Sequence, residues 1–86
     1  MHTVELLEEA VALAVRAGFG VRQDWFGGAP AGACELKGQK WIFIDLALSA
    51  REQLDQVVEA LREAPIPPDT TISRQLQALL APRKAA

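Results

Sequence analysis

The run from Trp41 to Leu46, Trp-Ile-Phe-Ile-Asp-Leu, is the most apolar stretch of this 86-residue chain. As an extended strand it directs alternate side chains to opposite faces: Ile42, Ile44 and Leu46 to one, and Trp41, Phe43 and Asp45 to the other. A strand that is apolar on both faces is normally covered on both and lies inside its sheet. The run therefore predicts a central strand, with other strands along its edges.

Two amphipathic helices are predicted, one before this strand in the sequence, over residues 3–17, and one after it, over residues 49–64. Thr3 is suited to cap the first helix, and Ser49 with Glu52 forms a capping box for the second. Apolar residues recur at the spacing of one helical face. They are Val4, Leu7, Val11, Ala14 and Val15 in the first helix, and Leu54, Val57, Val58 and Leu61 in the second.

Two shorter strands are expected before the central one. Residues 19–25 alternate in polarity and predict an edge strand, and residues 33–36 form a hairpin with 40–47, turning at Gly38. Between them, the sequence FGGAPAG predicts a flexible loop. Its loop-forming residues are Gly27, Gly28, Pro30 and Gly32.

These elements predict an α+β fold: helix, three-stranded antiparallel sheet, helix, then a short C-terminal helix, with both main helices on one face of the sheet. A single domain is expected over 1–64 and a prolyl spacer over 65–69, because three prolines stiffen that segment. The C-terminal helix is expected over 70–82, and residues 83–86 are expected to be frayed.

Charge and composition argue against several classes of partner. The net charge is −2, with nine basic residues scattered among eleven acidic ones, so no basic patch for nucleic acid is expected. No apolar run approaches the roughly 20 residues that span a bilayer, so no membrane partner is expected. The N-terminus lacks the pattern of a signal peptide, and the single cysteine cannot form an internal disulfide. These features favour the cytoplasm.

Few residues suggest catalysis or metal binding. The only histidine, His2, and the only cysteine, Cys34, are far apart in the chain, so no metal site and no cofactor are expected. Cysteine is among the most buried residue types, which favours a structural Cys34 over a nucleophile. Asp24 and Asp45 are a candidate carboxylate pair that would need a pocket to divide acid and base roles.

The hairpin and the following helix resemble those of a family of small bacterial proteins. The shared features are the GxCxL pattern at Gly32–Leu36, a glycine turn, the apolar strand at 41–46 and the EQLDQVVEAL helix. This resemblance implies a small cytoplasmic domain and no particular activity. The core is also remotely similar to that of ImmA/IrrE-type zinc metallopeptidases. Glu59-Ala60-Leu61-Arg62-Glu63 stands where that family has HExxH, so the similarity implies a metal-free relative without the catalytic histidines.

The aromatic row of the central strand is the strongest functional feature. If both helices cover the other face of the sheet, the row of Trp41 and Phe43 is left uncovered, and Trp25 lies beside it. This row predicts a protein-interaction or self-association surface. The C-terminal helix could instead cover this row, or pair with a second subunit in a homodimer. Its apolar stripe is Ile72, Leu76, Leu79 and Leu80. Two further hypotheses are a small-ligand protein with FGGAPAG as a flap, and a thiol-dependent enzyme centred on Cys34.

Overall fold

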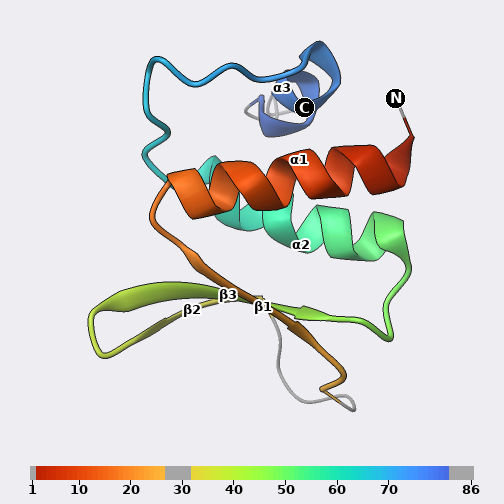
Figure 1. Ribbon diagram of the computed structural model, residues 1–86, viewed down its shortest axis with the longest axis vertical. Coiled ribbons are helices and arrows are strands. Elements are labelled where there is room, and N and C mark those ends of the chain that lie inside the picture. The colour runs from red at the N-terminus through yellow and green to blue at the C-terminus, as the bar shows by residue number, and fades with distance from the viewer. Residues whose placement is uncertain (1, 27–31, 82–86) are drawn as a thin grey trace, which may run out of the picture.

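The computed structural model describes residues 2–26 and 32–81. It contains three helices and one three-stranded sheet (Figure 1). In chain order the elements are α1 (Thr3–Arg16), β1 (Gly20–Asp24), β2 (Gly32–Leu36), β3 (Gln39–Asp45), α2 (Ala50–Arg62) and α3 (Arg74–Leu80). They form three layers: the sheet, then α1 and α2 together, then α3 on the far side of those helices. The predicted α+β class and the two main helices on one face of the sheet are confirmed.

The central position of β3 is also confirmed, because the strand order is β1-β3-β2. β2 and β3 are antiparallel, and Lys37 and Gly38 join them with φ angles of 51° and 78°. Positive φ at both central residues marks a type I′ turn, whose twist matches that of a hairpin.

The prediction of a purely antiparallel sheet is wrong, because β1 pairs parallel to β3. The tight hairpin places β2 on one edge of β3 and leaves only the other edge for β1. α1 and α2 lie side by side and run in the same direction, and a short turn reverses the chain between each helix and its strand (Figure 1). β1 and β3 therefore also run in the same direction.

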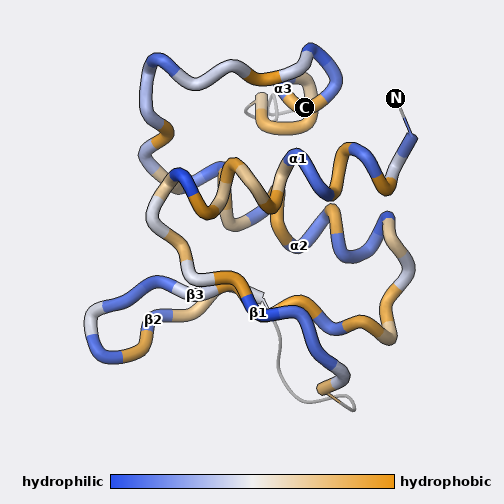
Figure 2. The backbone as a smooth tube through the Cα atoms, viewed as in Figure 1, coloured by the Kyte–Doolittle hydropathy of each residue, from blue (hydrophilic) through white to orange (hydrophobic). Residues whose placement is uncertain are grey.

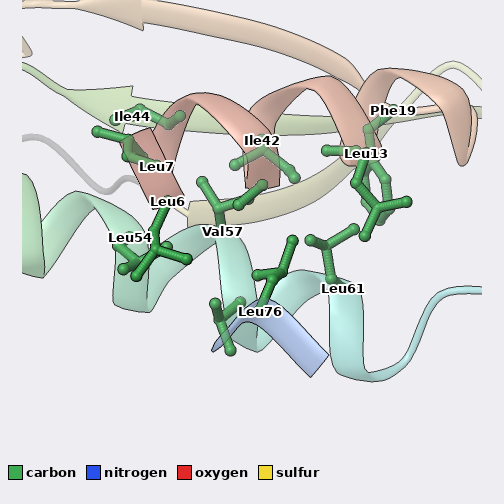
Figure 3. Packing of buried hydrophobic residues seen from close by; sticks show 13 residues of the cluster. Leu6, Leu7, Leu13, Phe19, Ile42, Ile44, Leu54, Val57, Leu61 and Leu76 are labelled. Carbon is green, nitrogen blue, oxygen red and sulfur yellow. The ribbon is translucent and has the colours of Figure 1, made fainter. Parts of the chain in front are cut away.

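The core lies between the sheet and the two main helices. Ile42 and Ile44 of β3 are completely buried and pack against α1 and α2 (Figure 3). Hydrophobic and hydrophilic segments alternate along both helices, as expected when one side is buried (Figure 2). The buried residues are Leu6, Leu7, Ala10, Leu13 and Ala14 of α1, and Gln53, Leu54, Val57, Val58 and Leu61 of α2.

The ends of the helices confirm one predicted cap and correct another. Ser49 Oγ accepts a hydrogen bond from the Glu52 amide at 3.2 Å, and Glu52 Oε1 accepts one from the Ser49 amide at 3.1 Å, so the capping box is present. At α1 the N-cap is His2 rather than Thr3, and no side chain caps it. Val4 and Val15 are exposed because the buried stripe of α1 is rotated toward Leu6 and Leu13.

α3 packs on the outer side of α1 and α2, so it does not cover the Trp41 and Phe43 row. Leu76 is completely buried there. The Ser73 amide and hydroxyl donate to the Glu9 carboxylate at 2.8 and 2.6 Å, and Arg62 Nη2 donates to the Leu79 carbonyl at 2.9 Å. These contacts join α3 to the same core as the rest of the chain.

Leu76→Ala should therefore lower the free energy of unfolding by about 2–5 kcal/mol, because it leaves a cavity at a fully buried site. The matched control is Gln75→Ala, one residue away on the exposed side of α3, which should change it by less than about 0.5 kcal/mol. Urea unfolding followed by circular dichroism measures both. Equal stabilities of the two variants would contradict the placement of α3.

Candidate functional site

The face of the sheet opposite α1 and α2 has no helix over it in the described part of the chain (Figure 1). Residues directly opposite one another on paired strands share a face. Trp41 is opposite Gly20 on β1 and Cys34 on β2, and Phe43 is opposite Arg22 on β1. We call this surface the aromatic face and define it by Arg22, Cys34, Leu36, Trp41 and Phe43, together with Phe26, whose ring packs on Phe43.

Three aromatic rings form a contiguous cluster on this face. The Trp41 and Phe43 rings are stacked, with centroids 5.9 Å apart and planes 8° from parallel. Phe26 meets Phe43 edge to face, with centroids 5.8 Å apart and planes at 83°. Each such pair adds about 0.5–1.5 kcal/mol beyond the area it buries. The cluster is therefore a preorganised surface rather than a set of independent side chains.

Gly20 allows the Trp41 ring to lie flat on the sheet. A Cβ atom at position 20 would lie 2.7 Å from Cε3 and Cζ3 of that ring, closer than van der Waals contact permits. The indole thus rests on the backbone of β1. Its contacts with Gly20 and Phe43 fix its orientation, while part of the ring stays accessible to solvent.

Trp41, Phe43 and Phe26 are partly buried, whereas Leu36 is 51% exposed and Cys34 is also exposed. Trp25 is 69% exposed just beyond the end of β1, where its amide donates to Asp24 Oδ1 at 2.7 Å. Contiguous apolar side chains that reach the surface mark sites that meet another molecule, and the stacked Trp41 and Phe43 rings with Phe26 are the contiguous part of this surface.

The structure separates the predicted interaction residues into two groups. Trp41 and Phe43 share the aromatic face, and Trp25 lies at the edge of the same sheet. The C-terminal residues Ile72, Leu76, Leu79 and Leu80 pack against the core from the opposite side of the molecule. Of the predicted loop residues, Gly32 begins β2, and Gly27, Gly28 and Pro30 lie outside the described residues.

Phe26 is the member of the aromatic face that sequence analysis missed. Phe26 is the first residue of FGGAPAG, which the sequence assigned to a loop, so it was given no role in the strand. β1 ends at Asp24, and the Phe26 amide donates to Asp45 Oδ1 at 3.4 Å. Phe26 continues the row of Gly20, Arg22 and Asp24, which the register places on the aromatic face, and its ring packs on Phe43 there.

The prediction of a buried Cys34 is wrong, because the thiol is exposed. β2 is an outer strand, and four of its five residues are exposed. Cys34 is opposite Trp41, on the face of the sheet that no described helix covers, so it is exposed although α2 contacts β2 on the other face. Within the described residues, no side chain hydrogen-bonds to the thiol.

Asp24 and Asp45 do lie opposite each other, as their spacing suggested. Asp45 is buried, and its Oδ1 accepts a hydrogen bond from the Ala47 amide at 2.9 Å. Asp24 contacts Arg22 at 3.6 Å and accepts from the Trp25 amide. Both carboxylates therefore hold the backbone at the end of the sheet by accepting hydrogen bonds from nearby amides. Neither carboxylate lines the groove between β2 and α2.

A groove of about 480 Å³ lies between β2 and α2, on the helix side of the sheet. Its lining residues are Phe19, Gly32, Ala33, Cys34, Glu35, Lys40, Gln56, Glu59, Ala60 and Glu63. Most of these side chains are exposed, so the groove is open to solvent. A typical ligand pocket buries 70–90% or more of its ligand, which an open groove does not do.

Over 2–26 and 32–81, no group of three or more His, Cys, Asp or Glu side chains is arranged to hold a metal ion. No helix in the same residues has both the length and the apolar character needed to cross a bilayer.

Comparison of the chain with family models, curated proteins and solved structures finds no match. The two resemblances suggested by the hairpin and the helix therefore stay predictions.

We predict that Gly20→Ala destabilises the fold by about 1–3 kcal/mol, because the new methyl group collides with the Trp41 ring. The control is a double-mutant cycle with Trp41→Ala, in which the cost of Gly20→Ala should largely disappear. Urea unfolding of the four proteins gives the coupling energy. An unchanged cost in the Trp41→Ala background would show that the ring does not rest on Gly20.

Proposed function

We propose that this protein is a non-catalytic interaction module whose aromatic face docks onto another protein or onto a second copy of itself. The observation that carries the proposal is the placement of every described helix on one side of the sheet, with the stacked Trp41 and Phe43 on the other. No described helix lies over these rings, which are partly buried and pack against one another and against Phe26.

The physical case rests on what the aromatic face would gain by being covered. Its rings are already fixed by stacking, by Gly20 and by Phe26, so docking costs little side-chain entropy. Tryptophan is enriched among the residues that dominate binding energies, especially where neighbouring contacts exclude water. A domain of 86 residues also has a small core, and a partner would add to its limited stability.

The two alternative hypotheses have weaker support. A small-ligand protein would use the groove between β2 and α2, but its exposed rim encloses little. A thiol-dependent enzyme needs a base or a positive charge near the nucleophile. Cys34 has Glu35 beside it in the chain and no hydrogen-bond partner in the described residues.

A photo-crosslinking amino acid placed at Arg22 tests the proposal, because Arg22 is exposed and lies opposite Phe43 on the aromatic face. The matched control carries the same group at Val4, which is 56% exposed on α1. We expect irradiation in the source cell to give a defined adduct from position 22 and none from position 4. A Trp41→Leu change should reduce that adduct at least about tenfold, since it removes the central ring of the docking surface.

The mass of the adduct identifies the partner class. An adduct of twice the chain mass indicates a second copy, and any other defined mass indicates a different protein. Equal labelling from positions 22 and 4, or no adduct from either, would overturn the proposal. Thermal unfolding of the Trp41→Leu variant checks that a lost adduct is not caused by a lost fold.

A further inference from the structure

The outer edge of β2 is a second surface, distinct from the aromatic face. β3 pairs with one side of β2, and no described strand pairs with the other. An open edge presents unpaired N–H and C=O groups that can join another strand, and natural proteins usually protect such edges with charges, proline or a covering segment. β2 has only one charged residue, Glu35, and no proline.

The opposite edge of the sheet differs in this respect. β1 carries two charged residues, Arg22 and Asp24, which form an ion pair at 3.6 Å. Three of the five residues of β1 are polar, namely Arg22, Gln23 and Asp24. Charged side chains of this kind discourage strand addition. Of the two edges, β2 is therefore the one suited to pairing.

The hairpin determines which backbone groups of β2 are available. A two-residue type I′ turn at Lys37 and Gly38 closes on a hydrogen-bonded pair, here Leu36 and Gln39. Bonded and non-bonded pairs alternate along an antiparallel ladder. Counting from the turn, Ala33 and Glu35 direct their N–H and C=O groups away from β3, toward the open edge.

We propose that β2 pairs antiparallel with β2 of a second copy, about a two-fold axis at Cys34, and joins the two sheets into one. In this register Ala33 of each copy is opposite Glu35 of the other, so the outward backbone groups of both residues meet. The two Cys34 residues form the central pair, which is not hydrogen-bonded.

Four features favour pairing with a second copy in this register. The register pairs every residue of Gly32–Leu36 with a residue of the same strand in the second copy. It places the exposed Leu36 opposite Gly32, which has no side chain to collide with it. Glu35 meets Ala33 rather than a like charge, whereas a register centred on Glu35 would oppose two carboxylates. Within its own copy each Glu35 is opposite Lys40, which offsets its charge.

The charge distribution along the sheet also suits an antiparallel neighbour. Lys37 and Lys40 lie at the turn end of the sheet, and Asp24 and Asp45 lie at the other end. Antiparallel pairing sets the basic end of one copy beside the acidic end of the other. Because Cys34 and Leu36 belong to the aromatic face, the two aromatic faces would lie on the same side of the joined sheet.

This pairing goes beyond the proposed docking function and does not depend on it. It uses the backbone edge of β2, whereas docking uses the side chains above the sheet. An experiment can therefore remove one and leave the other intact.

Disulfide cross-linking of the purified full chain tests the register. Diamide oxidises two thiols to a disulfide, and the two protons and two electrons released reduce diamide to the corresponding hydrazine. Side chains at a non-bonded pair lie close enough for a disulfide. In the proposed register only Cys34 lies directly opposite its own counterpart in the second copy. We expect it to form the covalent dimer at least about tenfold faster than a cysteine at position 33 or 35, whose counterpart is displaced along the strand.

The matched controls carry the single cysteine one position away, as Ala33→Cys or Glu35→Cys in a Cys34→Ala background. Both positions are exposed, so a random collision would oxidise them as readily as Cys34. The advantage of Cys34 should vanish in urea, where no strand remains. Equal rates for the three proteins in native buffer would overturn the proposed register.

Ala33→Pro tests strand pairing without a disulfide. Its amide points away from β3, so proline removes a donor to the second copy and none from the hairpin. We expect the reduced wild-type chain and an Ala33→Val control to show a dimer that grows with concentration in light scattering, and Ala33→Pro to stay monomeric. A wild-type monomer at all concentrations, or an Ala33→Pro dimer with an intact circular dichroism spectrum, would overturn the proposal. The Arg22 adduct reports separately on the aromatic face.

Discussion

The double-sided apolar character of β3 is the constraint on which the rest of the structure depends. Ile42 and Ile44 have no exposed surface, because α1 and α2 cover them from one side. β1 and β2 form hydrogen bonds with the backbone along the two edges of the same strand. The opposite side of β3 carries Trp41 and Phe43, and no described helix lies over them. One strand thus defines both the core and the candidate site.

Local sequence signals were sufficient for the order of the helices and strands and for the cap of α2, but not for the cap of α1. The capping box at Ser49, the glycine turn at Gly38 and the apolar period of α2 each act over a few residues, and each is present. The central position of β3 could also be predicted, because a strand apolar on both faces is poorly suited to an edge.

Features that depend on how distant elements meet could not be predicted in this way. The parallel direction of β1 follows from the packing of α1 beside α2, and no residue within β1 encodes it. Cys34 is exposed because the strand register places it on the face of the sheet that no described helix covers, although cysteine is usually buried. α3 could have met any apolar surface, and its position depends on Leu76 and on the Glu9–Ser73 contact, 64 residues apart in the chain.

The same limit applies to the site. Trp41 and Phe43 could be identified from alternation alone, but the role of Gly20 beneath the indole requires the register between β1 and β3. That register turns two ordinary aromatic residues into a rigid surface. The surface sits beside an open strand edge, so the chain offers two distinct ways to associate, one through side chains and one through backbone groups.

Hydroxyl-radical footprinting can show whether a partner covers the aromatic face, because it reports side-chain exposure residue by residue. The dilute purified chain would be compared with the same chain in an extract of its source cell. The account predicts strong oxidation of Trp41 and Phe43 in the dilute chain and clear protection in the extract, with Val4 and Val15 oxidised equally in both. Equal oxidation of Trp41 and Phe43 in the two samples would show that the aromatic face is not used for docking.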